Sequence, residues 1–207
     1  SITRDDEDTI KGTSTKLPRN TPISCDELLK AMIVHSDNYA AHALSRSAGI
    51  SRAQFIQKMN EKARQLGMTA THFSDSSGLS SSNVSSAMDL VKLAKYSLKK
   101  PELQKLSNER ATLVQVGNRR VFMQNTSALV REEIFDAALN KTGYIRESGY
   151  NLVFVNKRRC GNNATIGVIS LNNRSSAKRS NFTKTKLEQY GCASLAHNHH
   201  FSDNDDS

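Results

Sequence analysis

Apolar side chains recur at every third or fourth position through most of residues 23–100, which is the period of amphipathic helices. The first such stretch follows a polar and charged segment, residues 1–22. Ser24 is placed as an N-cap, and Glu27 stands three residues later, at the spacing of a capping box. The pattern therefore predicts a helix that begins after Ser24 and ends near His35.

Two more helices and a long loop follow in this part of the chain. An Ala-rich helix should end at Gly49, and a third should run from about Ser51 to Leu66 with its apolar residues on one face. Residues 68–86 are rich in Ser, Asp and Gly, which indicates a loop. The next helix should end before Pro101, because proline cannot continue a helix.

From residue 111 onward the apolar period changes to two, which is typical of strands. Residues 111–123 and 137–158 each predict a hairpin of two strands joined by a turn. The apolar run 165–171 suits a central strand, and residues 176–190 predict a closing helix. Helices thus come first and an antiparallel sheet later, so the predicted fold class is α+β or mixed α/β.

The charge balance favours anionic partners without selecting one. The chain has 207 residues, with 29 Lys and Arg against 20 Asp and Glu, and a net charge of +9. Such a surplus attracts nucleic acid, acidic polysaccharide, peptidoglycan stem peptides or anionic lipid. Basic stretches are not interleaved with aromatic residues, so a stacking surface for single strands is not evident. No apolar run reaches the ~18 residues of a membrane-spanning helix, and the first residues show no signal-peptide pattern.

The three cysteines, Cys25, Cys160 and Cys192, show neither a CxxC motif nor a spacing with histidine that would indicate a zinc or redox site. Their odd number leaves the pairing open, and the simplest interpretation is three unpaired or partly buried thiols. A chain of this length can bury roughly 70% of its unfolded surface, so a core is possible without disulfide staples.

Residues 194–207 are polar and lack apolar periodicity, which predicts a disordered tail after a domain that covers residues 1–193. His197, His199 and His200 lie close together there and could hold a stray metal ion, but a polar tail is the better interpretation. We accordingly expect no metal site and no cofactor.

The tripeptide Lys141-Thr142-Gly143 lies in the first strand of the second predicted hairpin and occurs once in the chain. A given tripeptide is expected by chance in only roughly 0.03 of chains this long, although motif matches carry a false-positive risk. Gly143 lacks a side chain at a point where another backbone could approach the sheet edge. Taken alone, Lys141 would be an ordinary solvated lysine at the end of a strand.

The triplet Ser36-Asp37-Asn38 combines residues that favour caps and turns, and it lies between two predicted helices. Residues 202–204 repeat the triplet in the tail without such a context, so the triplet alone is weak evidence. Ser36 and Asn38 could be simple helix caps. Combined with Lys141 further along the chain, however, they match a set of motifs found with S-x-x-K in penicillin-recognising serine enzymes.

With these motifs the chain resembles the low-molecular-weight penicillin-binding proteins, the serine D-alanyl-D-alanine peptidases. Five segments look like successive landmarks of that family, in its order: SDNYAAHAL, LGMTATHFSDSSGL, SSAMDLVKLAKY, FMQNTSAL and KTGYIRESGYNLVFV. The opening stretch DDEDTIKGTSTKLPRN is most similar to the D-alanyl-D-alanine endopeptidase branch, which cuts cross-links between peptidoglycan stems.

The resemblance implies a β-lactamase/transpeptidase-like fold, with helices packed on an antiparallel sheet. It also implies hydrolysis of D-alanyl peptide bonds of peptidoglycan through an acyl-enzyme, in the periplasm or cell envelope, without a metal or cofactor. By their position in the motifs, the resemblance implies catalytic roles for three residues. Ser36 would relay a proton to the leaving amine, Asn38 would hydrogen-bond the substrate amide, and Lys141 would add positive potential.

Substrate-binding roles pass to the residues that follow Lys141. Thr142 and Gly143 would pair with the extended peptide as an added strand, and the backbone N–H of Tyr144 would supply half of an oxyanion hole. Tyr144 could also be simply a packed aromatic residue. β-Lactams would be covalent inhibitors only where the nucleophile is present.

The sequence departs from the family at the nucleophile. A Ser-x-x-Lys motif should precede Ser36 by several tens of residues, but residues 1–4 end in an Arg, which stays protonated and cannot act as the base. The matches at residues 97–100 and 175–178 follow Ser36, and we interpret them as accidents. We expect a chain that is truncated at its N-terminus, inactive by itself, and left with an exposed sheet edge.

Three other interpretations stay open. A non-catalytic peptidoglycan-binding remnant would keep the Lys141 strand and the basic surface. A basic nucleic-acid-binding protein would show salt-dependent binding that Lys141→Ala does not change, although nucleic acid is not the partner we expect. A β-lactamase is disfavoured, because no Glu stands where a deacylating base would be recognisable.

Overall fold

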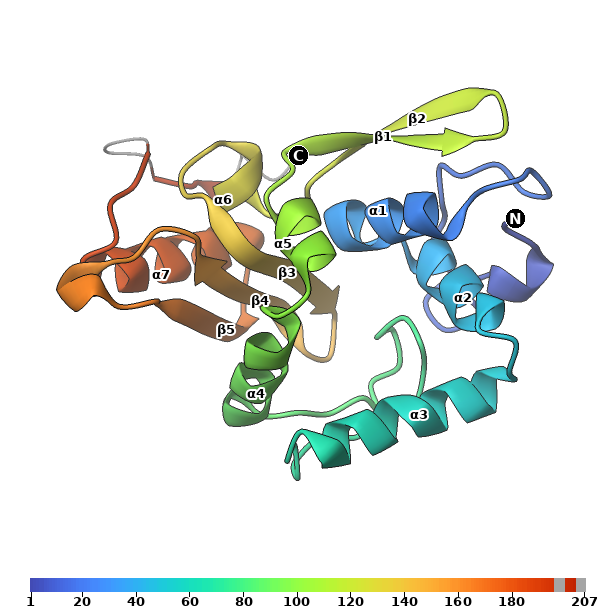
Figure 1. Ribbon diagram of the computed structural model, residues 1–207, viewed down its shortest axis with the longest axis horizontal. Helices are drawn as coiled ribbons and strands as arrows, with labels where there is room; N and C mark the ends of the chain where they lie inside the picture. Colours follow the sequence, from blue (N-terminus) through green and yellow to red (C-terminus); the bar gives the residue numbers. More distant parts are fainter. Residues whose placement is uncertain (196–199, 204–207) are drawn as a thin grey trace.

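The computed structural model describes residues 1–195 and 200–203, and its elements divide into two groups along the chain (Figure 1). The first group is η1 (Arg4–Asp6), α1 (Cys25–His35), α2 (Asn38–Ser47), α3 (Arg52–Gln65), α4 (Ala87–Ser97), α5 (Pro101–Ser107), β1 (Ala111–Val116) and β2 (Arg119–Gln124). The second group is α6 (Ala128–Arg131), β3 (Ala137–Ile145), β4 (Gly149–Asn156), η2 (Gly161–Asn163), β5 (Gly167–Asn173) and α7 (Ser176–Gln189). The mixed α+β class predicted from the sequence is confirmed.

Local capping chemistry sets the start of α1. Ser24 Oγ accepts the backbone N–H of Glu27 at 3.2 Å, as its N-cap position predicts. The Glu27 side chain does not complete a capping box. Its Oε2 accepts the backbone N–H of Gln115 at 2.8 Å instead, and this bond ties the first turn of α1 to β1.

The short helix α5 was not predicted from the sequence. Pro101 stands at its first position, where the fixed φ of proline suits a helix start and no N–H is needed. The prediction that α4 ends before Pro101 is correct, but the same proline also begins the next helix.

Strands β3, β4 and β5 form one antiparallel sheet in that order, and β1 pairs with β2 in a separate hairpin. Within the described part of the chain β4 is therefore the central strand, and β5 lies at an edge. The expectation that the apolar run 165–171 forms a central strand is wrong for this sheet. The strand is apolar because helices cover the faces of the sheet, and not because it lies in the centre.

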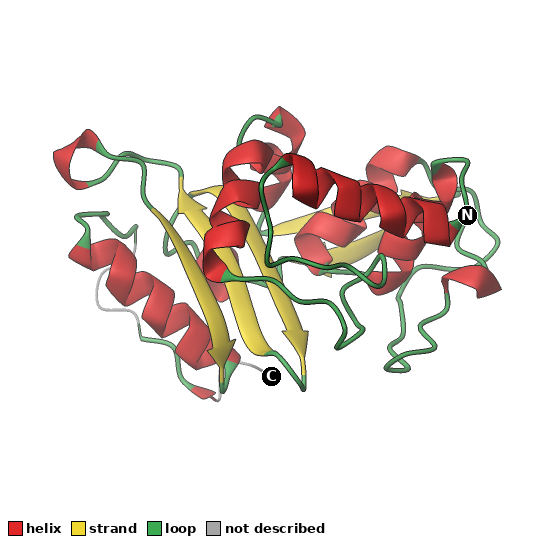
Figure 2. Cartoon of the chain, turned by 90° about the horizontal axis from the view of Figure 1, so that it is seen from below, coloured by secondary structure: helices red, strands yellow, loops and turns green. Residues whose placement is uncertain are grey.

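The three-stranded sheet lies between helices (Figure 2). Helix α7 covers one face, where Leu152 and Phe154 of β4 are buried in a cluster with Leu187 of α7. Helix α4 packs on the other face, where Ala94 meets Val155. A separate core joins α1 and α2 to the β1–β2 hairpin, so the molecule has two main apolar clusters.

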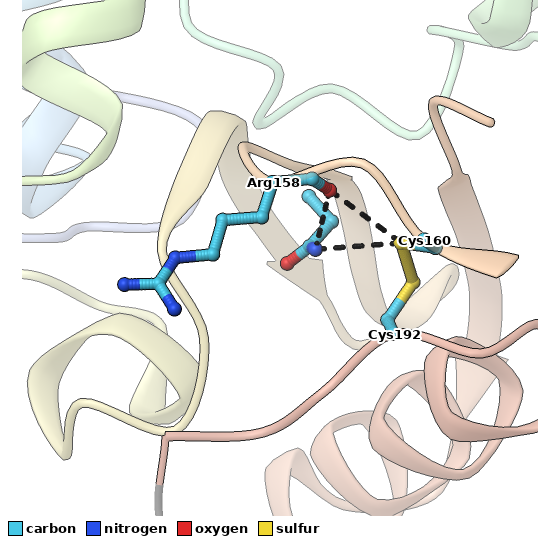
Figure 3. Close-up of a disulfide and its surroundings, with 4 residues drawn as sticks. Arg158, Cys160 and Cys192 are labelled. Carbon is cyan, nitrogen blue, oxygen red and sulfur yellow. Dashed lines mark hydrogen bonds between the residues drawn. A yellow bond between two sulfur atoms is a disulfide. The ribbon is translucent and has the colours of Figure 1, made fainter. Parts of the chain in front are cut away.

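A disulfide links Cys160 to Cys192, with an Sγ–Sγ distance of 2.09 Å, and fastens the end of α7 to the segment after β4 (Figure 3). The interpretation of three free thiols is therefore wrong for two of them, because the fold brings together cysteines that are 32 residues apart. Asn156 Nδ2 lies 3.5 Å from Cys160 Sγ and donates to the carbonyl of Arg158 at 2.9 Å. Cys25 is free and exposed.

Two described residues of the predicted tail are ordered parts of the fold. Phe201 is 3% exposed and joins the core beside α7, and its backbone exchanges two hydrogen bonds with the Asn181 side chain. The backbone N–H of Leu195 donates to Ile134 O at 2.7 Å. The polar-tail expectation for 194–207 fails at these positions because one aromatic residue is enough to anchor a segment without periodicity.

His197 and His199 lie outside the described residues. Among the residues that the structure does describe, no group of His, Cys, Asp and Glu is arranged to hold a metal ion. None of the described helices is long and apolar enough to cross a membrane.

Candidate active site

The turn between α1 and α2 holds Ser36, Asp37 and Asn38 at a helix corner, as the sequence predicts. Ser36 ends α1 in the left-handed conformation, with φ 57° and ψ 35°. Asp37 is the N-cap of α2, and its Oδ1 accepts the backbone N–H of Ala40 at 2.9 Å. We call residues 36–38 the α1–α2 corner.

Lys141, Thr142, Gly143 and Tyr144 lie on β3 and form what we call the β3 edge. Among the described strands β3 pairs only with β4, so its other edge is unpaired. A side chain placed at Gly143 would meet no atom within 4 Å, so the strand is open to approach at this position. An extended peptide can add to such an edge by backbone hydrogen bonds.

The fold brings the two motifs into contact, although 105 residues separate Ser36 from Lys141. Lys141 Nζ donates to Ser36 Oγ and, at 2.9 Å, to the carbonyl of Thr142. Thr142 Oγ1 lies 3.4 Å from Ser36 Oγ and 2.6 Å from Thr126 Oγ1. The lysine and the three hydroxyl groups thus form one connected polar group between the corner and the edge.

Burial, together with the positive charge of nearby Arg179, lowers the pKa of Lys141 to about 8. A lysine with this pKa is mostly protonated at neutral pH but releases its proton far more readily than an exposed lysine does. Because the ammonium donates to Ser36 Oγ, the Ser36 hydroxyl proton is left to point toward another acceptor. The pair is suited to transfer a proton at the groove.

A groove with a volume of about 670 Å³ lies between the corner and the edge. Ser36, Asn38 and the β3 edge line it, together with Ser76 and Arg179. The structure therefore gathers all six site residues predicted from the sequence around one hollow.

Sequence reasoning missed Arg179, a residue of α7 that is 5% exposed. Its guanidinium lies 5.5 Å from the ring centroid of Tyr150, and its Nη1 donates to the carbonyl of Asn151 at 3.3 Å. Nothing in the pattern of α7 distinguishes this arginine from its exposed neighbours. With Lys141 it makes the groove positively charged.

Tyr144 is 53% exposed and stacks on Tyr150, with 4.1 Å between the ring centroids. Its stacking on Tyr150 agrees with the alternative of a packed aromatic residue, although the ring lies at the groove and not in the core. Both rings line the groove, and they provide a flat apolar surface beside the β3 edge.

The loop between α3 and α4 supplies another side of the groove and is held by Asp75. Asp75 Oδ1 accepts the N–H of Ser77 at 2.6 Å and of Gly78 at 2.7 Å, and Oδ2 accepts the N–H of Ser80 at 2.7 Å. Burial alone would raise the pKa of Asp75, but these bonds and others from side chains lower it to about 2. The Ser-rich sequence correctly predicts a loop here. The hydrogen bonds that Asp75 accepts explain why this loop is ordered.

His42 of α2 adds a further contact to this loop, with Nδ1 2.7 Å from Ser76 Oγ. Burial and the charge of Arg52 lower the pKa of His42, so its neutral form is favoured.

The nucleophile is the part of a serine-peptidase site that these residues do not provide. Ser97 and Ser175, which begin the two Ser-x-x-Lys matches, do not line the groove. Ser175 is the N-cap of α7 and accepts the N–H of Lys178 at 3.1 Å. The ammonium of Lys100 lies 5.1 Å from the centroid of the Tyr96 ring.

A second cavity, of about 320 Å³, lies between α4, α5 and the sheet and reaches the β3 edge at Lys141. Ile33, Leu93, Leu139 and Val153 make much of its surface apolar, and Ser97 also lines it. An apolar cavity of this size beside the polar groove is suited to hold further apolar side chains.

Comparison with known proteins relates the chain to D-alanyl-D-alanine peptidases. Residues 2–174 match the model of a family described as D-alanyl-D-alanine carboxypeptidase. A D-alanyl-D-alanine endopeptidase of Haemophilus influenzae is 71% identical over 195 residues, which are 94% of this chain and 66% of that protein. The chain spans between about half and two thirds of the length of the first curated relatives that it matches.

Solved structures agree on the fold. A variant of a Streptomyces DD-transpeptidase superposes with a TM-score of 0.80 at 26% identity, over 92% of this chain and 78% of that one. A penicillin-binding protein of Listeria monocytogenes in its ampicillin-bound form superposes with a TM-score of 0.68 at 27% identity, over 82% of this chain and 68% of that one.

Proposed function

The chain belongs to the D-alanyl-D-alanine carboxypeptidase family, and from this premise we propose that its groove binds a D-alanyl peptide of peptidoglycan for cleavage by a serine nucleophile. The contact between Lys141 and Ser36 at the open β3 edge carries this proposal. Acyl transfer needs a proton path to the leaving group, donors for the oxyanion and a surface that aligns the peptide. The corner and the edge offer these elements.

Ser36 relays a proton to the amine that leaves when the peptide bond is cleaved: it gives up its hydroxyl proton and takes the proton that the base has removed from the nucleophile. The ammonium of Lys141 donates to Ser36 Oγ and orients the hydroxyl proton outward, and its charge stabilises the negative charge that develops during the reaction. Asn38 forms a hydrogen bond with an amide of the bound peptide.

The peptide lies along the β3 edge as an additional strand. Thr142 and Gly143 pair with its backbone, and the backbone N–H of Tyr144 donates to the oxyanion. Arg179 and Lys141 attract the carboxylate of the peptide, because both cations line the groove.

The nucleophile and its base come from a Ser-x-x-Lys segment that residues 1–35 do not contain. We propose that apolar side chains of the helix that carries this motif enter the 320 Å³ cavity, which meets the groove at Lys141. Residues 1–207 alone are then expected to bind peptide without cleaving it.

The endopeptidase branch is the preferred assignment, since the relative at 71% identity is named an endopeptidase. The natural substrate is then a cross-link between two peptidoglycan stems, and the location is the periplasm or cell envelope. Digestion of purified dimeric and monomeric muropeptides by a longer chain, one that carries a Ser-x-x-Lys segment upstream of Ser1, distinguishes the two activities. The products are identified by mass spectrometry. Cleavage of pentapeptide monomers alone would make it a carboxypeptidase.

Labelling with a fluorescent penicillin tests the proposed nucleophile. We expect no covalent label on the 207-residue chain, and a label on a longer chain that carries a Ser-x-x-Lys segment upstream of Ser1. In the longer chain Lys141→Ala should reduce labelling strongly, while Lys178→Ala, a change in the match on α7, should leave it intact. A label on the 207-residue chain would overturn the assignment and make Ser97 or Ser175 the nucleophile to test.

A non-catalytic peptidoglycan-binding protein is the second candidate, favoured by the complete and open β3 edge. Binding of the 207-residue chain to purified sacculi, without hydrolysis by the longer chain, would support it. Salt-dependent binding to DNA or RNA that persists in Lys141→Ala would point instead to a nucleic-acid-binding protein.

A further inference from the structure

The hairpin of β1 and β2 lies at the rim of the molecule, and side chains of α1 bond to one of its two outer edges (Figure 1). The backbone N–H of Gln115 donates to Glu27 Oε2 at 2.8 Å. The carbonyl of Leu113 accepts a hydrogen bond from Lys30 Nζ at 3.1 Å. Both residues of β1 thus direct their backbone groups away from β2 and toward α1.

The register of the hairpin then fixes the direction of the backbone groups on β2. Leu113 is paired with Phe122, and Gln115 is paired with Arg120. In an antiparallel pair, opposite residues that do not bond to each other both direct their N–H and C=O groups outward. The backbone groups of Arg120 and Phe122 therefore point away from β1, and no other described strand pairs with them.

A contact at the end of β2 agrees with this register. His35 Nδ1 donates to the carbonyl of Gln124 at 2.9 Å, so this carbonyl also points outward and already has a partner. The part of the outer edge that stays open is therefore residues 119–122, which we call the β2 edge. One edge of the hairpin is covered by its own helix, and the other is available to a further strand.

The side chains of the β2 edge combine an apolar surface with positive charge. Phe122 is 55% exposed and lies opposite Leu113, which is 48% exposed, so the two form an apolar pair on the outer face of the hairpin. Arg119 and Arg120 are both exposed. Because successive side chains of a strand alternate, each face carries one guanidinium. Neither arginine takes part in an ion pair within the described part of the chain.

We propose that the β2 edge binds an extended acidic segment of a partner protein, which adds to the hairpin as a third strand. Backbone hydrogen bonds to Arg120 and Phe122 align the segment. Its carboxylates meet the two arginines, and an apolar side chain between them packs on Phe122. The charge selects this partner, because a cationic edge on a chain of net charge +9 repels a basic strand and a second copy of the same chain.

Charged residues at the edge of a sheet can have the opposite purpose, since they also prevent unwanted strand pairing. That purpose alone does not explain an exposed aromatic ring, Phe122, at the same edge. The two roles differ in whether an acidic strand binds, so an experiment can separate them. The surface is independent of the function proposed for the groove.

The probe is a hexapeptide of alternating glutamate and valine, acetylated and amidated at its ends and added to the ¹⁵N-labelled 207-residue chain. We expect the backbone amides of Arg120 and Phe122 to shift together, with one dissociation constant. The same peptide methylated at every backbone nitrogen keeps its charge but has no N–H to donate. It should bind about tenfold more weakly or less, because several hydrogen bonds are lost.

Arg120→Glu should weaken binding of the unmodified peptide about fivefold, because it replaces an attraction by a repulsion at the edge. Lys95→Glu is the matched control: it makes the same change in net charge at an exposed position of α4 and should have little effect. Equal binding of the methylated peptide would show attraction by charge alone and overturn the proposal. Shifts confined to Thr142–Tyr144, or no binding at all, would also overturn it.

Discussion

The two sides of the groove are held in place by different kinds of interaction. The β3 edge, Lys141–Tyr144, belongs to a strand whose backbone pairs with β4 from Ala137 to Ile145 and whose sheet is covered on both faces. The α1–α2 corner, residues 36–38, has no such ladder. The side chains of Asp37 and Asn38 are held by polar contacts with residues 15 and 13, a segment distant in sequence, whereas Ser36 Oγ is held by Lys141.

Because of this difference, the two sides of the groove should respond differently to mutation. Loss of apolar packing should disturb the β3 edge through the stability of the whole sheet, because strand position depends on many contacts at once. Loss of one hydroxyl or carboxylate should disturb the corner locally, because the position of each side chain there depends on individual hydrogen bonds. Mutations can therefore separate effects on stability from effects on the site.

Phe154→Ala should cause the largest loss of stability, and it acts on the β3 side of the groove. The ring is fully buried beneath α7 and contacts Phe135 edge to face, with 6.3 Å between centroids. We expect the free energy of unfolding to fall by about 3–5 kcal/mol, as for other buried aromatic truncations. Urea unfolding measures it, with Phe122→Ala as control because that ring is 55% exposed. Equal losses for the two variants would contradict the assignment of the core.

Replacing Cys160 and Cys192 together with serine should have the next largest effect. The disulfide closes a loop between residues separated by 32 positions, for which the chain-entropy model gives about 3–4 kcal/mol. The melting temperature under oxidising conditions should fall, and a reducing agent should lower that of the original chain in the same way. Cys25→Ser should change nothing, and a comparable loss there would show that the pairing is wrong.

Asp37→Ala should act on the corner with a smaller cost. It removes the N-cap of α2 and the acceptor of the Thr15 hydroxyl, which lies 2.6 Å from Asp37 Oδ2. We expect a loss of about 1–2 kcal/mol, together with weaker peptide binding. Ser51→Ala removes the N-cap of α3 and should cost a similar amount of stability without any effect on the peptide. If both variants bind peptide equally well, the corner does not contribute to the site.

The pH dependence of Lys141 tests the contact between the two sides without any change to the corner itself. The pKa of this lysine is about 8 in the folded protein and 10.5 in the ordinary case, so the unfolded chain binds more protons between these values. The free energy of unfolding should therefore rise with pH from about 8 toward 10.5, relative to Lys141→Met. Parallel stability curves for the two proteins over this range would show that Lys141 is not buried.

The sequence predicted the β3 side more completely than the corner. Alternating apolar residues in β3 and β4 identify a hairpin, and the position of Lys141 within it follows directly. The location of Ser36 between two helices was also predictable, because Ser24, Gly49 and Ser51 are local signals. Local signals of this kind require no knowledge of the rest of the fold.

The contacts that complete the site could not be predicted, because they join segments distant in sequence. Thr13 and Arg179 look like ordinary polar residues until the fold places them beside Asn38 and Lys141. The disulfide is another example, since nothing in the spacing of three cysteines selects a pair. The single aromatic Phe201 likewise anchors a segment whose composition predicts disorder.

Titration of the ¹⁵N-labelled 207-residue chain with an N-acylated peptide that ends in D-Ala-D-Ala tests most directly whether the corner and the edge act as one binding site. We predict that the backbone amides of Thr142, Gly143 and Tyr144 and the side-chain amide of Asn38 shift together, with one dissociation constant. Shifts on only one side of the groove would contradict the account.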